Sequence, residues 1–271
     1  MELDRNAPIG VFDSGIGGLT VVKAVRETLP NEEIIYFGDT ARVPYGIKSV
    51  ETVREYAMQI TRFLLERNVK MILIACNTVS ASANGSIVEL AHPIPVLDVI
   101  SAGTEIAIEQ MSPSKNIGVI GTLATIQSGA YDRSLNGRDP DIHIYSRACP
   151  LLVPLAEEGW IDNQIAMLTL ENYLSDLRKL DLDSLILGCT HYPLFRESIQ
   201  SVMGDSAPLI LDSATSIAKM AKTKLKELEL ETERTDEGTF SCYVSDKPQR
   251  FQQLAERFLG HALHRVDIVH L

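Results

Sequence analysis

The chain has 271 residues and a formal net charge of −11, with 25 Lys and Arg against 36 Asp and Glu, and 45% of its residues are hydrophobic. These values are typical of a folded globular protein and exclude disordered, collagen-like and fibrous classes. The acidic balance argues against direct nucleic-acid binding, which needs a basic face, and against binding to an anionic membrane surface.

Targeting and redox features predict a cytoplasmic protein. The N-terminal segment MELDRNAPIG has no apolar core of signal-peptide length, and the longest apolar run, residues 71–76, is far shorter than a membrane span. The four cysteines are widely spaced and form no CxxC pair, so neither a disulfide framework nor a metal site is expected.

Short apolar runs alternate with amphipathic stretches along the chain. Within residues 50–67, for example, Val53, Ala57, Ile60 and Leu64 recur at helical spacing. This alternation predicts right-handed βαβ units and mostly parallel sheets with helices on both faces. Strands are predicted at 8–12, 33–37, 71–75, 95–97, 117–120, 143–147, 185–187, 209–211 and 240–244, and helices at 17–28, 50–67, 78–90, 249–259 and between the later strands.

A weak internal repeat indicates two related α/β lobes. Residues 9–14 (IGVFDS) resemble residues 117–122 (IGVIGT), and residues 72–78 (ILIACNT) resemble residues 185–191 (LILGCTH). The two pairs occur in the same order and at nearly the same offset.

Four predicted strand ends carry small polar residues, at 13–18, 76–78, 121–122 and 189–191. Ligands of open parallel sheets bind beyond the carboxyl ends of the strands, where a following helix offers backbone N–H groups to an anion. The glycine-rich run at 13–18 lacks the order of a dinucleotide or phosphate loop. By itself it predicts only a tight turn, with Asp13 as a helix cap.

Cys76 and Cys189 each end a buried strand and begin a predicted helix. A helix N-terminus lowers the pKa of a thiol, which makes the thiolate more available as a base. Either cysteine alone is more simply a core residue. As a matched pair facing one cleft, they could remove a proton from one face of a carbon and return one to the other, which inverts a stereocentre. His191 either orients Cys189 or is structural.

Other polar features are given structural roles. Cys149 and Cys242 lack the same context and are interpreted as packing residues, and the charge-rich stretch 226–238 as a solvated helix end and loop. A pyridoxal phosphate site would need a lysine at a strand end with phosphate-binding glycines around it, and the sequence shows no such lysine. No cofactor is therefore predicted. Three histidines near the C-terminus are interpreted as surface residues without a metal: His261, His264 and His270.

Six blocks, in order along most of the chain, resemble the glutamate racemase family. They are GVFDSGIGG (10–18), GDTARVPYG (38–46), ACNTVSAS (75–82), GTLAT (121–125), CPLLVPLAEEG (149–159) and LGCTHYPL (187–194). The resemblance implies a cofactor-independent enzyme that interconverts L- and D-glutamate in a site between two α/β lobes. We place the first lobe at 1–98 with 212–271 and the second at 99–211.

The resemblance also implies roles for individual residues. Cys76 is the base that acts on D-glutamate and Cys189 the base that acts on L-glutamate. Asp13 and His191 assist the thiols, as does an acidic residue that we place at Glu157, with Glu158 adjacent. The implied substrate contacts are Asp13, Ser14, Pro44, Tyr45, Gly46, Asn77, Thr78, Thr122, Thr190 and His191.

D-Glutamate is a precursor of bacterial peptidoglycan, so the resemblance implies a role in cell-wall synthesis. Some family members need a peptidoglycan precursor as activator, some bind DNA gyrase, and oligomeric states vary, homodimers included. Three other functions compete: an aspartate racemase, a Cys–His hydrolase or transferase with Cys189 as nucleophile, and a non-catalytic amino-acid-binding module. The CTHYP and PYG segments favour glutamate.

Overall fold

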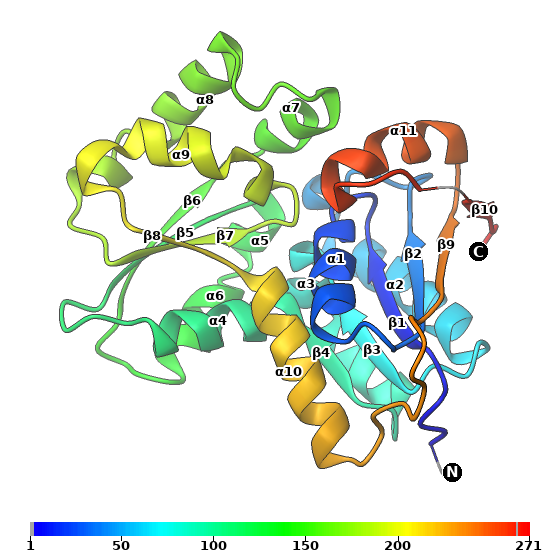
Figure 1. Cartoon of the computed structure of the whole chain (residues 1–271). Helices are drawn as coiled ribbons and strands as arrows, with labels where there is room; N and C mark the ends of the chain where they lie inside the picture. Colours follow the sequence, from blue (N-terminus) through cyan, green and yellow to red (C-terminus); the bar gives the residue numbers. More distant parts are fainter. Residues whose placement is uncertain (1–2, 264) are drawn as a thin grey trace.

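The computed structural model describes residues 3–263 and 265–271, and these form two α/β lobes (Figure 1). Each lobe contains one sheet whose paired strands all run parallel. The first sheet has the order β10-β9-β2-β1-β3-β4 and the second the order β6-β5-β7-β8. The strands are β1 (Ile9–Asp13), β2 (Ile34–Gly38), β3 (Met71–Ile74), β4 (Val96–Asp98), β5 (Asn116–Gly121), β6 (His143–Ala148), β7 (Ser184–Gly188), β8 (Leu209–Asp212), β9 (Phe240–Val244) and β10 (Asp267–Ile268).

The two sheets share one arrangement, which confirms the repeat seen in the sequence. In the first sheet β1 lies between β2 and β3, and in the second β5 lies between β6 and β7 in the same parallel sense. Strand β1 therefore corresponds to β5, and β3 to β7. Cys76 and Cys189 follow corresponding strands, each at the carboxyl edge of its sheet. The division of the chain at 98/99 and 211/212 stays a prediction.

The first sheet is covered on both faces because its strands alternate their side chains. Ile9 and Val11 pack with α1, α10 and α11, whereas Phe12 packs with α2 and α3 on the other face. The helices are α1 (Leu19–Thr28), α2 (Val50–Leu65), α3 (Asn77–Ala91), α10 (Ser213–Glu227) and α11 (Pro248–Leu259).

The second sheet is covered in the same way. Leu185 and Leu187 of β7 pack with α7, α8 and α9, while Ile186 packs with α4 and α6. The helices are α4 (Val99–Glu109), α5 (Leu123–Gln127), α6 (Ala130–Asn136), α7 (Leu152–Glu158), α8 (Gln164–Leu174) and α9 (Arg196–Met203), with short 3₁₀ helices η1 (Tyr45–Ile47), η2 (Leu177–Lys179), η3 (Tyr192–Phe195) and η4 (Gly204–Ser206).

Two capped helices join the lobes. Asp98 ends β4 and accepts hydrogen bonds from the backbone N–H groups of Ile100 (2.9 Å) and Ser101 (3.1 Å) at the start of α4. Asp212 ends β8 and caps α10 through the N–H of Ala214 (3.2 Å). Helices α4 and α10 pack against each other where the chain passes between the sheets (Figure 1).

The predicted strands and the named helices agree with the structure to within about two residues at their ends. Two differences concern short elements. The two-residue strand β10 was not predicted, since its sequence carries no alternating pattern. The segment after Cys189 forms the 3₁₀ helix η3, and α9 begins only at Arg196.

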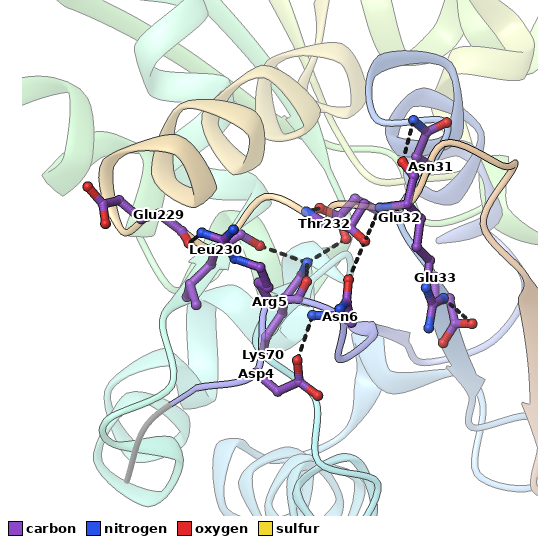
Figure 2. Close-up of polar contacts among 11 residues, drawn as sticks. Asp4, Arg5, Asn6, Asn31, Glu32, Glu33, Lys70, Glu229, Leu230 and Thr232 are labelled. Atoms are coloured by element: carbon purple, nitrogen blue, oxygen red, sulfur yellow. Dashed lines mark hydrogen bonds and ion pairs between the residues drawn. The ribbon is translucent and has the colours of Figure 1, made fainter.

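The charge-rich stretch differs in part from its interpretation as a solvated loop. Most of residues 228–238 are exposed, but Leu230 is buried, and its carbonyl accepts a hydrogen bond from the buried Lys70 (2.8 Å; Figure 2). The backbone of this segment is therefore fixed against the amino end of β3. Within the described part of the chain, no helix is long and apolar enough to cross a bilayer.

Candidate active site

A cavity of about 350 Å³ lies at the carboxyl ends of both sheets. This volume is within the range of small-molecule sites. Its lining includes all the predicted site residues except Asp13, which is almost fully buried at the end of β1. The first lobe contributes Ser14, Pro44, Tyr45, Gly46, Cys76, Asn77 and Thr78, and the second contributes Thr122, Glu157, Cys189, Thr190 and His191.

On the first-lobe side, Cys76 is the N-cap of α3, and its Sγ donates a hydrogen bond to Ser14 Oγ at 3.6 Å. Asp13 lies nearby, and its Oδ2 accepts from the N–H groups of Gly15 (3.2 Å) and Gly18 (3.0 Å). Burial, together with the charge of Asp13, raises the pKa of Cys76 to about 12. The expectation that the helix N-terminus lowers this pKa is wrong, because desolvation outweighs the backbone N–H groups.

On the second-lobe side, Cys189 Sγ lies 3.9 Å from Nδ1 of His191, and Nε2 of the same ring lies 3.3 Å from Glu157 Oε1. Burial alone would lower the pKa of His191, but hydrogen bonds to Cys189 and Glu157 outweigh it and raise this pKa to about 10. At neutral pH His191 is therefore an imidazolium, and both of its N–H groups are directed to acidic partners. Glu158, the adjacent alternative, instead pairs at the surface with Arg250.

The two lobes approach closely around the cavity. A Cβ atom on Gly17 would lie 2.3 Å from Thr190 Oγ1 and 2.6 Å from His191 Nδ1, so this position leaves no room for a side chain. Gly46 likewise lies against Thr122, where a Cβ would be 2.9 Å from Thr122 Cβ. The glycine-rich run therefore does more than make a turn, since it admits residues of the opposite lobe.

Hydroxyl groups also meet across the lobes. Thr78 Oγ1 lies 3.1 Å from Thr122 Oγ1, and Thr122 in turn caps α5 through the N–H of Thr125 (3.2 Å). On the cavity wall, the phenol of Tyr45 donates to the buried carboxylate of Asp39. Besides the imidazolium of His191, these donors are neutral hydroxyls, and neither Lys nor Arg is among the described lining residues of the cavity.

Sequence reasoning did not assign part of the lining. Gly15 lies in the glycine-rich run but was given no role, and the other missed residues are apolar or proline. The residues missed are Gly15, Val43, Ile47, Leu123, Pro150, Val153 and Pro154. All of them except Ile47 belong to blocks that resemble the family, so the resemblance was a signal for them. An apolar residue with no periodic partner gives no other signal in a single sequence.

The residues given structural roles lie outside the cavity lining. Cys149 and Cys242 are buried, and His261 and His270 are exposed, while His264 lies outside the described residues. Across residues 3–263 and 265–271, no three His, Cys, Asp or Glu side chains gather in a way that could hold a metal ion.

Comparisons with known proteins agree on one family. The sequence profile of the Asp/Glu/Hydantoin racemase family matches residues 10–221. The glutamate racemase of Syntrophus aciditrophicus is 50% identical over 264 residues, 97% of each chain, and that of Chlorobaculum tepidum is 46% identical over 268 residues, 99% of this chain and 98% of the relative. Among solved structures, glutamate racemase from Francisella tularensis in complex with D-glutamate matches with a TM-score of 0.92 and 43% identity, covering 98% of both chains.

Proposed function

The chain belongs to the Asp/Glu/hydantoin racemase family, and from this premise we propose that it interconverts L- and D-glutamate between its lobes, with Cys76 and Cys189 as the two bases. The observation that carries the proposal is the placement of the two thiols. They follow corresponding strands of two similar sheets and line one cavity. Each has its own acid–base partners, Asp13 and Ser14 for one and His191 and Glu157 for the other.

From L-glutamate, the Cys189 thiolate removes the α-proton, so that the C–H bond breaks and an S–H bond forms. The Cys76 thiol then donates its proton to the opposite face of the α-carbon, and its S–H bond breaks as the new C–H bond forms. The raised pKa of Cys76 supports this order, because a thiol with a pKa of about 12 is protonated and ready to donate at neutral pH. The reaction from D-glutamate runs through the same steps in reverse.

The polar lining fits a dicarboxylic amino acid. Ser14, Asn77, Thr78 and Thr190 offer neutral donors for the carboxylates, with Thr122 and the Pro44–Gly46 segment completing the wall. These neutral donors add no fixed positive charge to that of the buried His191 imidazolium. Asp13 can face the substrate ammonium or assist Cys76.

Glutamate is favoured over aspartate because relatives matching the whole chain at 46–50% identity are glutamate racemases. A Cys–His hydrolase would use Cys189 and His191 but would leave Cys76 without a role, and an amino-acid-binding module would need neither thiol. The product D-glutamate supplies bacterial peptidoglycan synthesis in the cytoplasm. A peptidoglycan-precursor activator and a homodimer stay predictions.

The test follows the α-hydrogen during turnover in D₂O. When L-glutamate is the substrate and the reaction is stopped early, NMR should show D-glutamate deuterated at the α-carbon and remaining L-glutamate still protiated, because Cys76 delivers a solvent-exchanged deuteron. D-Glutamate as substrate should give the mirror result. Product that keeps its original α-hydrogen would overturn the two-base proposal.

A matched control uses Cys242, which is buried in β9 and is not among the cavity-lining residues. Cys242→Ala should keep the wild-type labelling pattern. The protein is dialysed against EDTA beforehand. Activity that returns only on addition of pyridoxal phosphate would contradict the thiol mechanism.

A further inference from the structure

A buried tyrosine of the second lobe forms a hydrogen bond to a cavity-lining residue of the first lobe. Tyr131 lies on α6 in the second lobe and is 2% exposed. Its hydroxyl donates a hydrogen bond of 2.8 Å to the side-chain Oδ1 of Asn77, which begins α3 in the first lobe. This contact was not predictable from the sequence, because the two residues belong to different lobes.

The phenol ring occupies a space that two glycines leave open. A Cβ on Gly103 of α4 would lie 3.0 Å from the Tyr131 hydroxyl, and a Cβ on Gly188 of β7 would lie 3.0 Å from the ring atom Cε2. Gly188 directly precedes Cys189, and Asn77 directly follows Cys76. Tyr131 therefore contacts the residue next to each of the two thiols.

The hydrogen bond determines which end of the amide remains free. An asparagine side chain has an acceptor oxygen and a donor nitrogen on one planar group, so fixing the oxygen also fixes the nitrogen. Asn77 Nδ2 is buried and has no hydrogen-bond partner among the described residues, although Asn77 lines the cavity. Burial, with the charges of Asp98 and Cys189, raises the pKa of Tyr131, so the phenol keeps the proton that it donates.

We infer that Tyr131 is a positioning residue, which turns the amide of Asn77 so that its N–H₂ group donates to a carboxylate of bound glutamate. This inference rests on the proposed function, and it gives Asn77 a specific task within it. A buried donor without a protein partner favours an anionic acceptor over an ammonium or an apolar group. Tyr131 thereby contributes to the selection of an acidic substrate without touching it.

The first test is a double-mutant cycle on KM for L- and D-glutamate. Tyr131→Phe removes only the hydroxyl and should raise KM about 10-fold, with a smaller change in kcat, as expected for one misoriented hydrogen bond to a charged group. In an Asn77→Ala background the same change should raise KM less than about 2-fold, because the amide through which Tyr131 acts is already gone. Equal effects in the two backgrounds would overturn the inference.

Tyr192→Phe is the matched control. Tyr192 is also fully buried, and its hydroxyl donates to a backbone carbonyl, that of Cys149, at 2.7 Å. Any effect of Tyr192→Phe on KM should be the same in the wild-type and the Asn77→Ala backgrounds. Coupling to Asn77 as strong as that of Tyr131 would show a general loss of packing rather than positioning, and would count against the inference.

A second variant tests the amide orientation without changing Tyr131, and it decides the matter if Tyr131→Phe does not fold. In Asn77→Asp the Tyr131 phenol can still donate to one carboxylate oxygen of the new side chain. The other carboxylate oxygen then takes the place of the Asn77 N–H₂ donor. KM for glutamate should then rise above that of Asn77→Ala, because two carboxylates face each other. An unchanged or lower KM would mean that position 77 presents an acceptor, and would refute the inference.

These outcomes are separate from those that test the two-base proposal. If Cys76→Ser turns over normally, the proposed mechanism fails whatever the cycle shows. If both thiols are essential but Tyr131 and Asn77 act independently, only the positioning role fails.

Discussion

Two groups of buried polar side chains lie at opposite ends of the first sheet. Lys70 precedes β3 and Cys76 follows it. We call the set Arg5, Glu32, Lys70, Leu230 and Thr232 the Lys70 cluster (Figure 2). In this cluster the Lys70 ammonium contacts Glu32 and the carbonyls of Arg5 and Leu230, and Glu32 Oε1 also accepts from the N–H of Thr232 (2.9 Å).

At the other end, in the cavity lining and directly behind it, two buried polar atoms have no partner in the described part of the chain. Of the described residues, none bonds to Asp13 Oδ1 or to Asn77 Nδ2, although both atoms are buried. An unpaired buried polar atom costs stability, whereas a paired one fixes the chain segments that supply its partners. The contrast suggests that the Lys70 cluster serves the fold, and that the cavity gives up stability to keep groups available for a ligand.

The largest expected effect is the loss of activity when either thiol is replaced. Cys76→Ser and Cys189→Ser should each lower kcat by at least about 10³-fold, because serine is close in size but far less acidic than cysteine and cannot serve as the base or as a comparable donor near neutral pH. The melting temperature should change little. Polarimetry of L-glutamate and thermal unfolding measure the two quantities. Near-normal turnover in Cys76→Ser would favour a single nucleophile at Cys189 instead.

The converse effect is expected in the Lys70 cluster. Lys70→Met should lower the free energy of unfolding by about 3–5 kcal/mol, because it leaves the buried Glu32 carboxylate without its cation. At temperatures where the variant is folded, kcat should remain that of the wild type. Urea unfolding and a racemisation assay at low temperature test the two halves of this prediction.

Lys179→Met is the control for loss of a lysine charge. Lys179 pairs with Asp176 at 3.1 Å, and both side chains are exposed. Removing this ion pair should cost no more than about 0.5 kcal/mol. If Lys70→Met were equally mild, or if it abolished activity in the folded state, the separation between the two regions would fail.

Asp13→Asn tests whether the buried charge of Asp13 lowers stability while it serves activity. Its carboxylate accepts two backbone hydrogen bonds through Oδ2, but Oδ1 has no described partner. Turnover should fall about 10²-fold, as expected for a group that assists acid–base chemistry. The melting temperature should stay the same or rise, since a buried negative charge is removed. A clear fall in stability with unchanged turnover would make Asp13 a structural helix cap.

The contrast also explains what could be predicted from the sequence. Short apolar runs identified β1, β3, β5 and β7, and the polar residues at the ends of these strands indicated Cys76 and Cys189, because parallel strands bring their carboxyl ends to one edge. The Lys70 cluster gave no such signal. Glu32 and Lys70 precede strands without any pattern that marks them as buried. They are covered by the N-terminal segment at Arg5 and by residues 229–232, which are distant from both in sequence. The prediction that the pKa of Cys76 is lowered was wrong for the same reason, because the burial of this thiol depends on residues distant in sequence.

The smallest expected effect is a pH dependence of stability that belongs to the cavity alone. The pKa of His191 is about 10 in the folded protein, against about 6.5 for a histidine in an unfolded chain. Between these values the folded state binds one proton more, so this contribution to stability is complete below about pH 6.5 and is lost as the pH rises toward 10. The slope from one such proton is at most about 1.4 kcal/mol per pH unit. Thermal unfolding from pH 6.5 to 7.5, below the usual thiol pKa of about 8.5, should therefore show a shallower decline for His191→Ala than for the wild type. Lys70→Met should keep the wild-type slope despite its lower stability. Parallel curves for His191→Ala and the wild type would show that His191 is not held as an imidazolium, and would remove the main difference between the surroundings of Cys189 and Cys76.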